Sequence, residues 1–296
     1  MGLPGDAYKY PRPDSAGFCS PVVSDRLNFG KSYRKSTKKQ TSGLVNASNL
    51  LYNDTIKNIE RFCKNDNRFE VQVMIRFILV FLLLMLFLVL TIPWVIWEAV
   101  WGKKNMEARN HRCLAVVQFM FRLILKISGT KLVIEGMENI PRDKAVLYVG
   151  NHRSYFDILI GYTTVPGLLG FVAKKEMTRY PVLKNWMNYV QCLFLDREDT
   201  REALKTILEG IDKIKHGISI WIFPEGTRNK NSEPTELLPF KEGSLKMAEK
   251  TGCPVIPVAM LGNDGIFEQH IPFIRPRKVY LRYGKPIYLK ELLPEQ

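Results

Sequence analysis

The stretch Ala145-Val-Leu-Tyr-Val-Gly-Asn-His-Arg-Ser-Tyr-Phe-Asp-Ile-Leu-Ile-Gly161 decides the fold. Its first six residues are short, apolar and β-branched enough for a buried strand, and Ile158 to Gly161 are typical of the first turn of a helix. His152 therefore follows a strand, and Asp157 begins a helix. Side chains five residues apart in one straight helix would point about 140° away from each other. Across a strand-to-helix bend they can meet.

An imidazole held by a carboxylate is a candidate general base. A hydrogen bond from the imidazole to the Asp157 carboxylate would fix the tautomer of His152 and stabilise its protonated form. The spacing alone is a weak signal, because a chain with four histidines can contain it by chance. A histidine that only caps a strand end is the structural alternative, so the interpretation depends on residues further along the chain.

Short apolar runs alternate with helical patterns after residue 130. This alternation predicts an α/β domain with a largely parallel sheet of about seven strands flanked by helices. In such sheets binding sites gather at the carboxyl ends of the strands, where His152 falls. The expected strands are 131–136, 145–150, 170–174, 192–196, 218–223, 255–261 and 278–283, and the expected helices are 155–162, 181–189, 199–216 and 241–250.

An uncharged apolar stretch precedes this domain. Residues 77–97 would form a helix of about 30 Å, which matches the hydrocarbon core of a membrane. Tryptophans gather at its end, as in an interfacial belt, and Pro93 should kink it there. Residues 113–126 are typical of an interfacial helix, so the two could form a hairpin within one leaflet. Basic residues flank both ends of 77–97, which leaves its orientation, and whether it spans the bilayer, open.

Three parts of the chain are therefore expected. Residues 1–68 form a basic, disordered tail with a short polar helix, residues 69–128 the membrane and interfacial helices, and residues 129–296 the α/β domain. The basic run from Lys31 to Lys39 is either a solvated tail or a contact for anionic lipid. It is not a signal peptide, since no apolar core follows its charges within the usual distance.

The net charge of +14 suits nucleic acid, anionic lipid or phosphorylated substrates. No zinc-finger spacing or RNP motif appears, so no nucleic-acid partner is expected. The five cysteines are scattered, without a CxxC pair, which indicates a reducing compartment and no structural metal.

Cations recur at the ends of the expected strands. Arg228 closes Phe223-Pro-Glu-Gly-Thr-Arg228 and offers a bidentate fork for a phosphate. Gly226 in the same loop lets backbone approach a ligand, and its N–H could serve an oxyanion or a phosphate. Arg197 and Lys174 end two further strands. An ordinary Pro-Gly turn with surface ion pairs is the alternative for each segment alone, but a neutral ligand would hardly require so many cations.

Five segments in this order resemble the blocks of the glycerolipid acyltransferases, most closely the 1-acylglycerol-3-phosphate acyltransferases, which make phosphatidic acid. The resemblance covers about residues 70–290, and the first 65 residues have no counterpart in the family's pattern. The segments are Asn-His-Arg-Ser-Tyr-Phe-Asp (151–157), Ala-Lys-Lys-Glu (173–176), Phe-Leu-Asp-Arg (194–197), Phe-Pro-Glu-Gly-Thr-Arg (223–228) and Pro-Val-Ile-Pro-Val-Ala-Met (254–260).

The resemblance implies a mechanism without cofactor, metal or acyl-enzyme. His152 would act as the general base on the sn-2 hydroxyl, and Asp157 would orient it. The acyl donor would be acyl-CoA or acyl carrier protein, and the acceptor lysophosphatidate. The implied substrate-binding residues are Arg228, with Glu225, Gly226 and Thr227 in its loop, Arg197 in support, and Lys174, or less favourably Lys175.

The apolar helix 77–97 would hold the enzyme at a membrane, and the net positive charge would favour an anionic surface. The catalytic domain is expected on the cytoplasmic face. Acylation of glycerol-3-phosphate or of another lysophospholipid stays open, because one sequence does not reveal pocket size. A catalytically silent, membrane-bound lipid-binding protein is the alternative of another class. A hydrolase is disfavoured, because the chain has no GxSxG elbow and because Cys192 and Cys253 lie in apolar runs.

Overall fold

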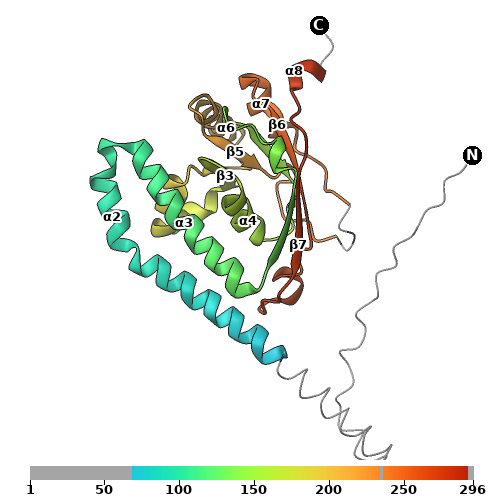
Figure 1. Cartoon of the computed structure of the whole chain (residues 1–296). Helices are drawn as coiled ribbons and strands as arrows, with labels where there is room; N and C mark the ends of the chain where they lie inside the picture. The colour runs from blue at the N-terminus through green and yellow to red at the C-terminus, as the bar shows by residue number, and fades with distance from the viewer. Residues whose placement is uncertain (1–68, 232, 234–235, 293–296) are drawn as a thin grey trace, which may run out of the picture. The chain divides into compact units, whose positions relative to one another are not determined.

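The computed structural model describes residues 69–231, 233 and 236–292 (Figure 1). The expected basic tail and the short polar helix before residue 69 lie outside this part of the chain.

A seven-stranded sheet forms the centre of the domain, in the order β1-β7-β6-β2-β5-β3-β4. All neighbours pair in parallel except β6 and β7, which are antiparallel. The predicted α/β class and the largely parallel sheet are confirmed. The strands are β1 (Lys131–Glu135), β2 (Leu147–Gly150), β3 (Leu169–Lys174), β4 (Leu193–Leu195), β5 (Ser219–Ile222), β6 (Val255–Leu261) and β7 (Lys278–Tyr283).

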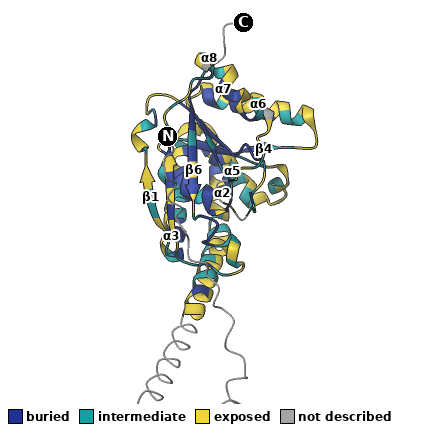
Figure 2. Ribbon diagram, turned by 90° about the vertical axis from the view of Figure 1, so that its right-hand side faces the viewer, coloured by how far each residue is buried: buried dark blue, intermediate teal, exposed yellow. Residues whose placement is uncertain are grey.

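Both faces of the central strands are buried, which explains why their sequences are continuously apolar. Tyr148 and Trp221 point to one face, and Leu147 and Ile220, one position earlier on the same strands, point to the other. Figure 2 shows β6 largely buried and the edge strand β1 exposed. The first face is covered by α3 (Met106–Ser128), α4 (Phe156–Thr164) and α5 (Pro181–Tyr189), and the second by α6 (Thr200–Lys215) and α7 (Lys246–Thr251).

The apolar N-terminal stretch forms a helix, Phe69–Val100, that is long and apolar enough to cross a membrane and is mostly unburied. Thr91 interrupts it as a turn, two residues before Pro93, and α2 (Ile92–Val100) continues beyond. The proline interrupts the helix because its ring cannot fit the regular backbone pattern. The expected kink is therefore present.

The chain turns back after α2, through a short 3-10 segment, η3 (Gly102–Lys104), and α3 returns toward the sheet (Figure 1). Arg112 on α3 forms an ion pair with the fully buried Glu98 on α2, with Nη2 and Oε2 2.9 Å apart. This pair joins the two helices at the corner.

Helix α3 contains the expected interfacial stretch 113–126 but begins earlier. It buries Leu114, Val117 and Leu125 in the core of the domain, whereas Phe119 on another face is 69% exposed. The helix is thus amphipathic, and its buried side belongs to the α/β domain.

Candidate active site

The strand-to-helix bend brings His152 and Asp157 together. The chain leaves β2 at Gly150, and α4 begins at Phe156, so both side chains stand at the carboxyl edge of the sheet. Nδ1 of His152 lies 2.9 Å from Oδ2 of Asp157. Asp157 is completely buried, while the side chain of His152 keeps 16% of its surface exposed. The imidazole can therefore use its other nitrogen, Nε2, toward a ligand.

Main-chain groups of the same bend hold the Asp157 carboxylate. The N–H groups of Arg153 and Ser154 each donate to Oδ2 at 2.9 Å. The side chain of Asn263 donates to Oδ1. Hydrogen bonds of this kind stabilise the ionised form of a carboxylate. The carboxylate accepts a hydrogen bond from Nδ1–H of His152, and in this tautomer Nε2 carries the lone pair that a general base requires.

Contacts from the loop after β5 fix the position of His152. The ring of Phe223 stacks on the imidazole, with centroids 4.0 Å apart and planes inclined by 12°. The N–H of His152 donates to Oε1 of Glu225 at 2.9 Å, and its carbonyl accepts from the N–H of Asn229 at 2.7 Å. The Phe223–Arg228 loop therefore positions the candidate base as well as the cation that the sequence singled out.

Asn151 fastens the bend to the neighbouring strand β6. Its Nδ2 donates to the carbonyl of Met260 at 2.9 Å, and its Oδ1 accepts from the N–H of the same residue at 2.8 Å. This paired contact satisfies the main chain of β6 beyond its pairing with β2, which ends at Gly150.

Arg228 lies against the loop that carries His152. Its guanidinium carbon is 3.8 Å from the ring centroid of Tyr155, and Nη2 donates to the Tyr155 hydroxyl at 3.0 Å. Nη1 lies 3.5 Å from Oε1 of Glu268. Burial raises the pKa of Glu268. The guanidinium side chain is 28% exposed, so it keeps surface for an anionic ligand.

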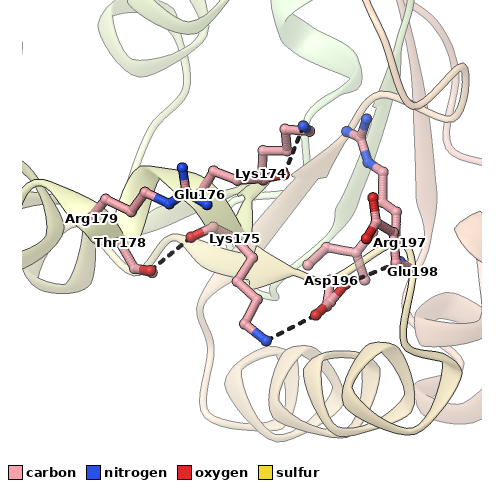
Figure 3. Close-up of a pocket in the computed structure, with 9 residues that line it drawn as sticks. Lys174, Lys175, Glu176, Thr178, Arg179, Asp196, Arg197 and Glu198 are labelled. Atoms are coloured by element: carbon pink, nitrogen blue, oxygen red, sulfur yellow. Dashed lines mark hydrogen bonds and ion pairs between the residues drawn. The ribbon is translucent and has the colours of Figure 1, made fainter.

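Two other predicted residues, Lys174 and Arg197, line a hollow of about 360 Å³ at the ends of β3 and β4 (Figure 3). Figure 3 shows their side chains extending to one side, and that of Lys175 extending to the other side toward Asp196. Nζ of Lys174 lies 2.7 Å from Oε1 of Glu176, and this bond lowers the pKa of Glu176.

The hollow does not include His152 or Arg228. The structure thus divides the predicted cations into two sets, with Arg228 beside the His–Asp pair and Lys174 and Arg197 at the next two strand ends. Since β2, β5, β3 and β4 are parallel neighbours, both sets occupy the same edge of the sheet.

The structure corrects two details of the Phe223–Arg228 loop. Glu225 is only 3% exposed, and its second oxygen, Oε2, accepts from the N–H of Leu238 at 3.0 Å, so both oxygens of this carboxylate hold main-chain N–H groups. The N–H of Gly226 donates to the carbonyl of Phe223 at 3.0 Å, so it is not available for an oxyanion or a phosphate. Gly226 is instead required for the turn, since its φ is +72°. Thr227 is exposed.

The loop between β6 and β7 contributes residues that the sequence did not single out. Besides Asn263, Asp264 accepts from Nε of Arg153 at 2.9 Å, and Oε1 of Glu268 accepts from the N–H of Tyr155 at 2.6 Å. These residues lie more than a hundred positions from the motif that they contact, in an irregular loop without periodicity. A lone Asn-Asp pair after an apolar strand was the only signal available.

Three buried thiols lie in the described part of the chain: Cys113, Cys192 and Cys253. Burial raises the pKa of each, to about 11 for Cys113. A thiol with a raised pKa is a poor nucleophile at neutral pH. Within the described residues, His, Cys, Asp and Glu side chains do not gather into a group that could hold a metal ion.

A family model described as "Acyltransferase" matches residues 131–261, which contain the strands β1 to β6 in chain order, that is, all strands of the sheet except β7. The "Probable 1-acyl-sn-glycerol-3-phosphate acyltransferase" of Mycoplasma pneumoniae is 34% identical over 210 residues, which cover 67% of this chain and 77% of that protein. This chain belongs to the acyltransferase family.

Two further relatives of this family support the assignment. The 1-acyl-sn-glycerol-3-phosphate acyltransferase of Borreliella burgdorferi is 34% identical over 166 residues, which cover 55% of this chain and 65% of that protein. The crystal structure of the 1-acyl-sn-glycerophosphate acyltransferase PlsC from Thermotoga maritima superposes with a TM-score of 0.63 at 27% identity, covering 76% of this chain and 89% of that one. The matched region thus spans just under two thirds of the Borreliella protein and 63% of the Saccharomyces cerevisiae relative.

Proposed function

We propose that this chain transfers an acyl group from an acyl thioester to the sn-2 hydroxyl of 1-acylglycerol-3-phosphate, giving phosphatidic acid. The contact between Nδ1 of His152 and the buried carboxylate of Asp157 carries the proposal, because it prepares a general base at the carboxyl edge of the sheet. The relatives named above act on this acceptor, which supports the choice of substrate.

His152 and Asp157 act as the catalytic pair in this proposal. Nε2 of His152 takes the proton of the acceptor hydroxyl while the oxygen attacks the thioester carbonyl. The resulting tetrahedral intermediate collapses with cleavage of the C–S bond, and the imidazolium returns its proton to the departing thiolate. Asp157 stabilises the imidazolium that exists between these steps. A thioester is already activated, so positioning and a base suffice without a covalent intermediate.

Arg228 binds the phosphate of the acceptor in this proposal. It lies on Tyr155, three residues from His152 in the chain, so a phosphate on its guanidinium would place the glycerol hydroxyls near the base. Lys174 and Arg197 supply further positive charge at the same edge of the sheet. Glu225, Gly226 and Thr227 complete the loop that presents Arg228.

The helix Phe69–Val100 would hold the site at a membrane surface, with the catalytic domain on the cytoplasmic face. Its exposed apolar side chains would insert into lipid, and the net positive charge of the chain would favour an anionic leaflet. The acceptor carries an acyl chain, so it could then enter the site laterally from the bilayer.

A panel of acceptors tests the choice of substrate. Membranes containing the full chain are supplied with labelled acyl-CoA or acyl carrier protein, and with lysophosphatidate, glycerol-3-phosphate or lysophosphatidylcholine. The proposal expects labelled phosphatidic acid as the main product with at least one donor. Faster acylation of glycerol-3-phosphate or lysophosphatidylcholine would make that acceptor the assigned substrate. Binding of lipid without acyl transfer would indicate a lipid-binding protein.

A further inference from the structure

The loop between β6 and β7, residues 262–277, lies outside all the motifs of the sequence but contacts the candidate catalytic pair. Asn263 is completely buried, and its Nδ2 donates to Oδ1 of Asp157. The other carboxylate oxygen, Oδ2, accepts from Nδ1 of His152 and from two main-chain N–H groups. The two oxygens of Asp157 therefore have separate partners.

The side-chain oxygen of Asn263, Oδ1, helps to identify the function of the residue. Oδ1 of Asn263 is buried and has no hydrogen-bond partner among the residues that the structure describes. A buried acceptor without a partner costs stability, which an apolar side chain of similar size would avoid. The hydrogen bond that Nδ2 donates to Asp157 is thus the interaction that explains an asparagine at this position.

The loop is built to hold Asn263 in place. The N–H of Ile266 donates to the carbonyl of Asn263 at 3.2 Å, and the N–H of Arg275 closes the loop by donating to the carbonyl of Ile266 at 2.8 Å. Ile266 is completely buried, and the ring of Phe267 stacks on Phe77 of the N-terminal helix at 6.4 Å. Asn263 therefore approaches Asp157 from a folded, anchored segment.

We propose that Asn263 is a positioning residue for acyl transfer. Its donor holds Oδ1 of Asp157, so that Oδ2 faces Nδ1 of His152 and the imidazole presents Nε2 to the acceptor hydroxyl. The inference rests on the proposed function, because it assigns Asn263 a part in the same reaction. Asn263 touches neither substrate nor reacting atoms and acts only through Asp157.

Removal of the side chain gives the first test. Asn263→Ala lowers kcat about 10- to 100-fold, the loss expected when a hydrogen bond to a charged group is removed. The KM for lysophosphatidate changes less than about threefold, because Arg228 and its loop are untouched. A kcat within twofold of wild type in folded protein would overturn the proposal, and so would a loss confined to KM.

Asn263→Asp gives the second test, which does not depend on the absolute yield of folded protein. Two carboxyl groups in hydrogen-bonding contact do not easily ionise together. At low pH the introduced carboxyl therefore keeps a proton and can donate to Oδ1 of Asp157. At higher pH both ionise and repel. The ratio of kcat between the variant and wild type therefore falls as the pH rises from about 5.5 to 8.5. A ratio independent of pH would overturn the proposal.

Matched variants separate the possible causes of a loss. Asn139 also donates Nδ2 to a protein oxygen, the main-chain carbonyl of Tyr283 at 2.9 Å, and this hydrogen bond involves none of the residues of the candidate site. Asn139→Ala also removes an amide hydrogen bond but should keep kcat within twofold of wild type, and an equal loss of kcat there would reduce Asn263 to a structural role. His152→Ala in the same membranes tests the proposed function itself. If His152→Ala retains full turnover, the reaction assignment fails, whereas a loss at His152 without one at Asn263 refutes this inference alone.

Discussion

The guanidinium of Arg228 stacks on the ring of Tyr155, with its central carbon 3.8 Å from the ring centroid. Tyr155 lies between His152 and Asp157 in the chain, whereas Arg228 follows β5, so the contact joins the two loops of the candidate site. The same tyrosine hydroxyl accepts from Nη2 of Arg228 at 3.0 Å. A planar cation held in this way is ordered before a ligand arrives, which suits the proposed phosphate contact.

Arg228→Ala should raise the KM for lysophosphatidate about 10- to 100-fold, the worth of one or two charge-assisted hydrogen bonds. The turnover at saturating acceptor should fall much less, because His152 and Asp157 are untouched. Steady-state kinetics with acceptor and donor varied separately measure both quantities. Arg282→Ala is the matched control, because Arg282 pairs with Glu135 on the exposed β1–β7 edge. An unchanged acceptor KM in Arg228→Ala would remove this residue from the phosphate site.

Lys174 and Arg197 should contribute less than Arg228. Both line a hollow that excludes His152, and Lys174 already pairs with Glu176. We expect Arg197→Ala and Lys174→Ala each to raise the acceptor KM, by about tenfold or less, which corresponds to one exposed charge contact. The same kinetic assay measures the effect. A loss larger than that of Arg228→Ala would place the phosphate in the hollow instead.

Glu268→Gln should stabilise the protein, and the gain should depend on pH. Burial raises the pKa of Glu268 above its ordinary value of 4.5. Between that value and the raised one, the folded protein binds a proton that the unfolded chain does not, so this residue makes the native state less stable as the pH rises. Glutamine removes this loss and can still accept from the N–H of Tyr155. The Tm difference between variant and wild type should grow from pH 4 to pH 7, and a difference that shrinks would contradict the assignment.

Gly161→Ala should destabilise the packing beneath the catalytic loop. A Cβ at this position on α4 would lie 2.6 Å from Cζ of Phe171 and 3.2 Å from Cζ3 of Trp221. Overpacking of this kind costs about 1–3 kcal/mol, which outweighs the gain in helix propensity of about 1 kcal/mol at most. Thermal unfolding in detergent measures the difference. Gly243→Ala, whose Cβ would approach only Ile207 at 3.9 Å, is the control and should not lower Tm.

The strands could be predicted to within one or two residues, because their apolar runs are bounded by charges, glycines and prolines. β6 and β7 occupy the residues predicted for them, and β4 is shorter by one residue at each end. The approach of His152 to Asp157 also followed from local sequence, since both lie in one bend. The antiparallel pairing of β6 with β7 could not be predicted from local sequence, because strand direction depends on the path of the connecting loop.

The rest of the site depends on contacts between distant residues. Asn263 and Asp157 are 106 positions apart in the chain, and no local sequence pattern predicts that their side chains are in contact. Glu225 was predicted to bind substrate from its place in a motif, but folding directs both its oxygens to main-chain N–H groups. The sequence shows which residue types gather at the strand ends, and only the fold shows which of them remain available to a ligand.

Acyl transfer by His152→Ala measures the central claim most directly. Wild type and variant are compared in membranes, at equal amounts of folded protein, with lysophosphatidate and both donor types. The loss of a general base predicts turnover lower by about 10²- to 10⁴-fold, with little change in the KM for lysophosphatidate. Phosphatidic acid formation by the variant at the wild-type rate would contradict the account.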